Sequence, residues 1–77
     1  MSTRAETIVA KLTQLGYVEQ KPLTRYRVFA KTGSMNKYVG SHGALRSGTT
    51  ITSAHPVGGG DYEEIIRILN LSLGTQT

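Results

Sequence analysis

Hydrophobic side chains recur every three or four positions near both ends of the chain, a spacing that predicts one amphipathic helix at each end. In the first segment the apolar positions share one helical face: Ala5, Ile8, Val9, Leu12 and Leu15. Thr3 and Glu6 match a capping box, and Gly16 suits the end of a helix. We therefore expect a helix over residues 4–15 that buries this face.

The second helical pattern follows three consecutive glycines, which we read with His55-Pro56-Val57 as a flexible lead. Its apolar stripe consists of Tyr62, Ile65, Ile66 and Leu69. Asp61 and Glu64 repeat the capping-box pattern, so we expect a helix over residues 61–71. Ile68 and Leu71 lie off the stripe, which favours a second contact surface such as a homodimer interface. The alternative is that Ile68 lines the edge of a wide core face.

Between the helices the hydrophobic period changes to two, which predicts strands. The expected strands cover residues of about 24–31, 37–41 and 44–52. We treat Tyr17-Val18 as re-entering the core and residues 19–23 as a connector broken by Pro22. The chain is thus expected to form a single α+β domain over residues 1–77. It would have the order αβββα and a three-stranded antiparallel meander with both helices on one face.

A five-residue loop after Lys31 and a two-residue turn at His42-Gly43 set the expected register, which pairs Lys31 with Lys37. This register turns one set of side chains toward the helices: Tyr26, Val28, Ala30, Tyr38, Gly40, Leu45 and Ile51. The open face would then carry cations around an aromatic ring and one valine: Arg25, Arg27, Phe29, Lys31, Lys37, Val39 and Arg46.

Charge is distributed unevenly along the 77 residues, which hold nine basic and five acidic side chains and a net charge of +4. The segment from Gln20 to Gly60 carries six basic residues and no Asp or Glu. Such a field favours a polyanion or an acidic protein surface as partner. The plain alternative is that these cations only keep the sheet edges soluble.

Several classes of chemistry lack their usual residues. With no Cys and only two His, neither a disulfide nor a metal site is expected, and no phosphate-binding glycine motif indicates a cofactor. His42 and His55 are expected in a turn and a loop, where structural roles are favoured over acid–base catalysis. A non-enzymatic protein is therefore favoured. No segment resembles a signal peptide or a membrane span, so we expect a cytoplasmic protein with no membrane partner.

Two resemblances add to this picture. The αβββα order, LGYVE at residues 15–19 and TITSAHPV at residues 50–57 resemble the small HicA-type messenger-RNA-cleaving toxins, which share the double-stranded-RNA-binding fold. Those toxins carry a catalytic His early in the first strand, where this chain has Thr24, Arg25 and Tyr26. The run YRVFAK…KYVGSHGALRSG looks like small uncharacterised proteins of bacteriophages and prophages.

Three functions follow in order of preference. The first is a small nucleic-acid-binding module of phage or bacterial origin, binding DNA or RNA through Arg25, Arg27, Phe29, Lys31, Lys37 and Arg46. The second is a phage-type inhibitor that binds an acidic surface of a host protein. The third is a HicA-like ribonuclease.

Overall fold

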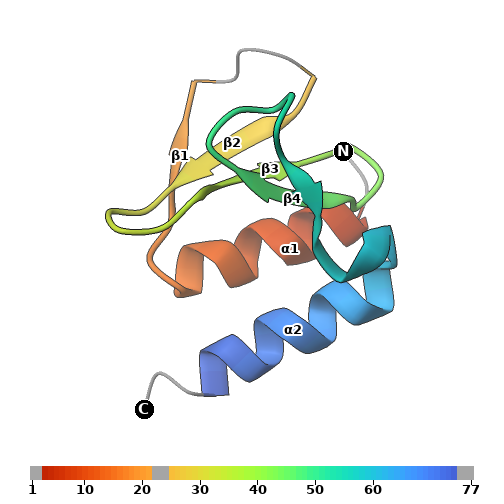
Figure 1. The fold of residues 1–77 in the computed structure, drawn as a ribbon. Helices are drawn as coiled ribbons and strands as arrows, with labels where there is room; N and C mark the ends of the chain where they lie inside the picture. The colour runs from red at the N-terminus through yellow and green to blue at the C-terminus, as the bar shows by residue number, and fades with distance from the viewer. Residues whose placement is uncertain (1–2, 22–24, 75–77) are drawn as a thin grey trace.

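The computed structural model describes residues 3–21 and 25–74, in which two helices lie on one side of a five-stranded antiparallel sheet (Figure 1). The elements in chain order are α1 (Thr3–Gln14), β1 (Val18–Gln20), β2 (Arg27–Ala30), β3 (Asn36–Val39), β4 (Leu45–Gly48), β5 (His55–Pro56), a short 3₁₀ turn (Val57–Gly60) and α2 (Tyr62–Gly74). The strands neighbour one another in chain order. The predicted α+β class with an antiparallel sheet is confirmed.

The predicted three-stranded αβββα layout is wrong, because two short strands extend the sheet at its edges. Val18–Gln20 pairs with β2, and Val18 is 63% exposed rather than part of the core. His55–Pro56 pairs with β4 instead of forming a flexible lead. Pro22 and Thr24, which we placed in the connector and at the start of a strand, lie outside the described residues.

The two helices bury the faces that their periodicity predicts. In α1 the fully buried side chains are Ala5, Ile8 and Leu12, and in α2 they are Ile65 and Leu69. Asp61 caps α2, since its Oδ1 accepts a hydrogen bond from the amide of Glu63 at 3.2 Å. Neither helix in the described part of the chain combines the length and apolarity needed to cross a bilayer.

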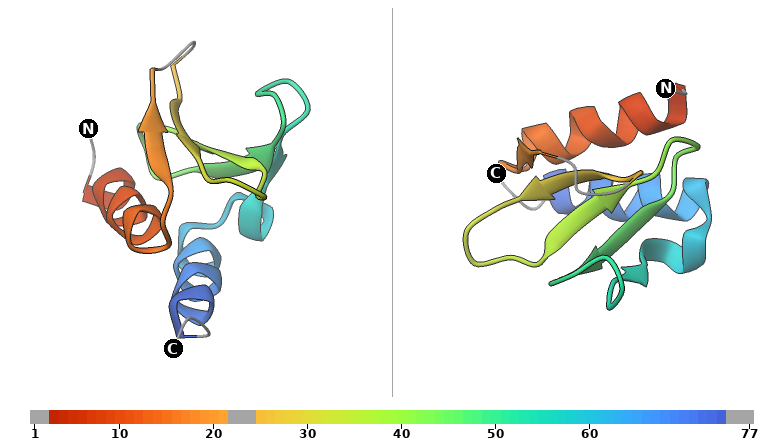
Figure 2. Two further views of the ribbon diagram at one scale, coloured as in Figure 1. Left: turned by 90° about the vertical axis from the view of Figure 1, so that its left-hand side faces the viewer. Right: turned by 90° about the horizontal axis from the view of Figure 1, so that it is seen from above.

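The sheet presents the opposite face to the helices from the one we expected. Phe29, Val39 and Leu45 pack into the core formed with α1 and α2. Val28 and Tyr38 point to the other side, where the loop after β4 covers them with Ile51 and Ala54. In Figure 2 this loop rises on the side of the sheet away from the helices. Leu45 therefore faces inward as predicted, whereas Tyr38 and Ile51 do not.

The turn between β3 and β4 explains part of this reversal. Gly40 and Ala44 bracket a three-residue loop, in which the amide of Gly40 donates to the carbonyl of Ala44 at 2.9 Å. Gly43 ends the loop with a φ of +92°, as in hairpins that close through a left-handed glycine. The predicted two-residue turn is one residue too short. Val39 consequently pairs with Leu45, and both side chains lie on the same face.

The pairing of β2 with β3 is shifted by two residues from the predicted register. Phe29, not Lys31, lies opposite Lys37, while Val28 lies opposite Tyr38. A shift of two keeps every side chain on its original face, because side chains alternate with a period of two. The grouping of Phe29, Val39 and Lys37 on one face was therefore predicted, but that face lies toward the helices.

Candidate functional site

Phe29 is part of the hydrophobic core and is unavailable for stacking on a base. Its side chain is 1% exposed and lies among residues of both helices. The prediction that cations surround an exposed Phe29 on the open face of the sheet is therefore wrong. Of the six residues assigned to that face, Arg27, Phe29 and Lys37 share the face toward the helices, whereas Arg46 lies on the opposite face.

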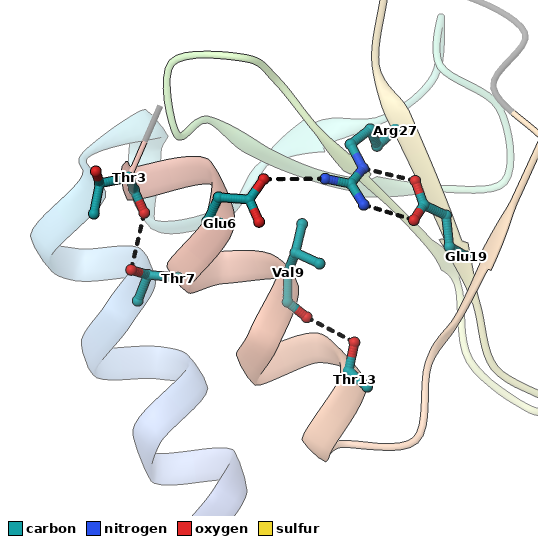
Figure 3. A network of polar contacts seen from close by, with 7 residues as sticks. All are labelled: Thr3, Glu6, Thr7, Val9, Thr13, Glu19 and Arg27. Atoms are coloured by element: carbon teal, nitrogen blue, oxygen red, sulfur yellow. Dashed lines mark hydrogen bonds and ion pairs between the residues drawn. The ribbon is translucent and has the colours of Figure 1, made fainter. Parts of the chain in front are cut away.

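Arg27 is held by two carboxylates. Its Nε and Nη2 each donate to Glu19 on β1 at 2.6 Å, and its Nη1 lies 3.5 Å from Glu6 on α1 (Figure 3). These hydrogen bonds hold the pKa of Glu19 below its ordinary value and raise that of Arg27. The guanidinium thus joins an edge strand to the first helix, and its charge is compensated within the protein.

We expect the Glu19–Arg27 pair to make the free energy of unfolding depend on pH in the acidic range. The folded state lowers the pKa of Glu19, so the unfolded chain takes up the proton more readily as the pH falls. The stabilisation is present above the ordinary pKa of 4.5 and is lost as the pH falls through the folded-state value. Because the Glu19 side chain is 39% exposed, screening limits the effect to about 1 kcal/mol or less.

Thermal unfolding of Glu19→Gln and of the unmodified protein between pH 3 and pH 7 measures this contribution. The two melting temperatures should differ near neutral pH and converge in acid. A difference that persists unchanged at the lowest pH would contradict the assignment. Glu63→Gln, which removes an exposed carboxylate from α2, is the matched control.

Arg25 and Arg46 contact other parts of the molecule than Lys31 and Lys37 do. Arg46 pairs with Tyr38 across the strands and so points to the side away from the helices, where its Nη1 donates to the carbonyl of Ala54 at 3.2 Å. Arg25 is exposed before β2 and borders a shallow hollow of about 180 Å³ together with Tyr26 and His42. Neither arginine is part of the site that Lys31 and Lys37 form, which is described next.

The fold brings predicted site residues together in two places. The Cζ of Arg27 lies 5.7 Å from the ring centroid of Phe29, and Lys31 and Lys37 meet on the ring of Tyr17. The Nζ of Lys31 lies 5.6 Å from the ring centroid and that of Lys37 lies 5.3 Å from it. Lys31 donates to the carbonyl of Leu15 at 2.7 Å, and Lys37 donates to Ser47 Oγ at 2.9 Å. We call Tyr17, Lys31, Lys37 and Ser47 the two-lysine site.

The position of this site follows from the ends of several elements. Tyr17 comes directly after α1, Lys31 directly after β2, and Lys37 lies on β3. All three are half-buried, and all three lie beside apolar side chains of the core, as lysine stems commonly do. In Figure 1 the loop between β2 and β3 and the carboxyl ends of both helices occupy the same end of the molecule.

The charge of the two-lysine site is not cancelled by neighbouring acids. Within residues 3–21 and 25–74, no carboxylate lies within 4.0 Å of either lysine ammonium group. Their hydrogen-bond acceptors are two backbone carbonyls, of Leu15 and Met35, and the hydroxyl of Ser47, all of which are neutral. Two cations without a neighbouring carboxylate form a site suited to an anion such as a phosphate or a carboxylate.

The site opens onto a hollow between the sheet and the helices. The hollow measures about 260 Å³, and its floor is formed by Leu12, Leu45 and Leu69, which are buried. Ile68 forms part of its wall. Ile68 thus lines the edge of the core face, whereas Leu71 is 59% exposed on α2. A homodimer through Ile68 and Leu71 stays a prediction.

The sequence indicated the two lysines but not the tyrosine that gathers them. Tyr17 was assigned only to the core, and it lies fourteen positions from Lys31. No pattern in the sequence connects the two. Ser47 separates Lys37 from His55 in the strand register, while His42 lies in the turn before β4. Among the described residues, no group of three or more His, Cys, Asp or Glu gathers to hold a metal ion.

Searches against protein-family models, curated proteins and solved structures found no match. The function is therefore argued from the geometry of the two-lysine site.

Proposed function

We propose that this protein is a small nucleic-acid-binding module whose phosphate contacts are made by Lys31 and Lys37. The observation that carries the proposal is the convergence of both ammonium groups on the ring of Tyr17, without a carboxylate beside them. Lys and Arg that neutralise phosphates release condensed counterions, and this release supplies most of the affinity of a basic protein for nucleic acid.

The distribution of the acids supports the same proposal. Glu6 and Glu19 are engaged by Arg27, and Glu64 is engaged by Arg67 on α2. The loop between β2 and β3 lies in the segment without Asp or Glu, with Lys31 at its start and Lys37 just beyond its end, so both cations lie at one end of the sheet. A polyanion approaching that end encounters attraction before contact is made.

The geometry bears differently on the two alternative functions. An acidic host protein would be attracted by the same lysines, so this alternative is separated from the first by experiment. A ribonuclease needs an acid and a base that face one reacting phosphate. His42 precedes β4 and His55 pairs with Ser47 near the other end of that strand, which does not favour such a pair.

The test is fluorescence anisotropy with labelled DNA and RNA at about 50 mM and 200 mM salt. We expect measurable binding at the lower concentration and a steep loss at the higher one. Replacing both lysines in Lys31→Gln/Lys37→Gln should weaken binding by roughly tenfold at low salt, since each exposed contact contributes up to about 1 kcal/mol. The slope of log K against log salt should fall by about 1.4–1.8, the amount expected for two phosphate contacts.

The matched control is Lys11→Gln/Lys21→Gln, which removes the same charge away from the two-lysine site. It should leave the salt slope close to that of the unmodified protein. Equal losses in the two double variants would show that net charge alone governs binding and would contradict the assigned site. Absence of any binding at low salt would remove the proposed function and favour an acidic protein partner.

A further inference from the structure

The hollow beside the two lysines has a composition that phosphate binding alone does not require. A site for phosphate needs cations and hydrogen-bond donors at a surface, as lysine and backbone amides supply. Here both lysines line a hollow together with the buried leucines Leu12, Leu45 and Leu69, and with Tyr17 and Ile68. A ligand that fills this site presents an anion to the lysines and an apolar group to the leucines.

The size of the hollow limits that apolar group. Pockets for drug-sized ligands measure about 300–1,000 Å³, whereas this hollow measures about 260 Å³. It therefore suits one ring system. Tyr17 lines this hollow, and its ring contacts both ammonium groups, so an aromatic side chain and two cations lie together at the site, as in proteins that bind single strands.

A duplex cannot deliver such a group, because its bases are paired and stacked inside while its phosphates lie outside. An unpaired nucleotide presents a flat base and an adjoining phosphate at the same time. We propose that the hollow receives one unpaired nucleobase while Lys31 and Lys37 hold the phosphates beside it. The ligand class is then single-stranded nucleic acid. This inference rests on the proposed function and adds to it the kind of strand that is bound.

Three labelled ligands of equal length separate the base from its phosphates: a twelve-nucleotide thymidine strand, the same backbone with abasic sites, and a twelve-base-pair duplex. Anisotropy at about 50 mM salt should show that the thymidine strand binds more tightly than the abasic strand. The expected ratio is about five- to hundredfold, the range that stacking of one base supplies. The duplex should bind no more tightly than the abasic strand.

A variant that fills the hollow tests whether the hollow causes the preference for the thymidine strand over the abasic strand. Ile68→Phe enlarges a side chain in the wall and should bring the ratio of thymidine to abasic binding close to one, while the salt slope with the abasic strand is retained. Leu71→Phe makes the same kind of change at an exposed position of α2 and should leave the ratio unaltered. If Ile68→Phe does not fold, the comparison of the three ligands on the unmodified protein still decides the question.

The outcomes distinguish this inference from the proposed function. Equal affinity for the thymidine and abasic strands, or a preference for the duplex, overturns the inference and leaves a phosphate-binding module. Dodecanoate, a fatty acid anion with no base, serves as a competing ligand for the hollow. If it binds while the thymidine and abasic strands bind equally, the hollow is a site for an acyl anion and the inference is overturned. Absence of binding to all three nucleic acids at low salt removes the proposed function as well.

Discussion

Replacing Phe29 with alanine is expected to remove a large part of the stability of the protein. Its side chain is 1% exposed at the centre of the core shared by the sheet and both helices. Truncation of a buried phenylalanine costs about 3–5 kcal/mol, because apolar contact is lost and a cavity remains. At about 0.05–0.15 kcal/mol per residue, the whole stability of a chain of this length is roughly 4–12 kcal/mol. The substitution therefore removes a large part of it.

Thermal unfolding followed by circular dichroism measures the effect. Each kcal/mol lowers the melting temperature of a domain of this size by about 4–8 °C, so we expect a fall of tens of degrees or no cooperative transition. Leu71→Ala, a truncation at a position that is 59% exposed, is the control and should change stability by about 0.5 kcal/mol or less. A Phe29→Ala protein with an unchanged melting temperature but weaker nucleic-acid binding would restore the exposed ring predicted from the sequence.

Alanine at Gly43 is expected to produce the second large loss of stability, through backbone strain and steric overlap together. Gly43 has a φ of +92°, a conformation that costs other residues about 1–2 kcal/mol. An added Cβ would also lie 2.6 Å from Cβ of Arg4 on α1. The Cβ of Arg4 is fixed to the helix backbone, so this overlap is removed only if the turn and the helix move apart. That separation costs about a further 1–3 kcal/mol.

Gly33 provides a control with nearly the same backbone and no neighbour. Its φ is +81°, and an added Cβ would meet no atom within 4 Å. Urea denaturation of Gly33→Ala should therefore show the conformational cost alone, about 1–2 kcal/mol. The additional loss in Gly43→Ala measures the contact of the hairpin with α1. Equal losses in both variants would indicate that the hairpin does not rest on Arg4 as described.

The contact at Gly43 also bears on how the two-lysine site is positioned. Arg4 stands over the ring of Tyr62, with Cζ 4.8 Å from its centroid, so the starts of both helices meet the turn between β3 and β4. α1 begins at this junction and ends at Gln14, and Tyr17, three residues further on, contacts both lysines. The helix thus connects the contact at Gly43 with the two-lysine site.

The positions of the helices were predictable, because their information is local. A stripe of apolar residues at a spacing of three or four defines a helix without reference to the rest of the chain. The buried residues Ile8, Leu12, Ile65 and Leu69 were all identified in this way. Period-two alternation similarly identified the three central strands. The short edge strands were missed, because three or two residues carry too little pattern to be distinguished from a connector.

The face of the sheet that meets the helices was not determined by alternation. Both faces of β2 and β3 carry apolar side chains: Phe29 and Val39 on one, Val28 and Tyr38 on the other. The length of one hairpin loop decides between them, since a three-residue loop places Leu45 beside Val39. The face that gains Leu45 then becomes the more apolar one and packs against the helices.

The candidate site was likewise predictable from the sequence only in part. The sequence by itself determined that the middle of the chain is basic and free of acid, and that Lys31 and Lys37 flank one loop. Only the tertiary structure decided which charges remain uncompensated. It placed Glu6 and Glu19 on Arg27, Tyr17 beneath both lysines, and Phe29 in the core. The physical reason is that ion pairs and ring contacts depend on distance in space, whereas charge and periodicity are properties of the chain alone.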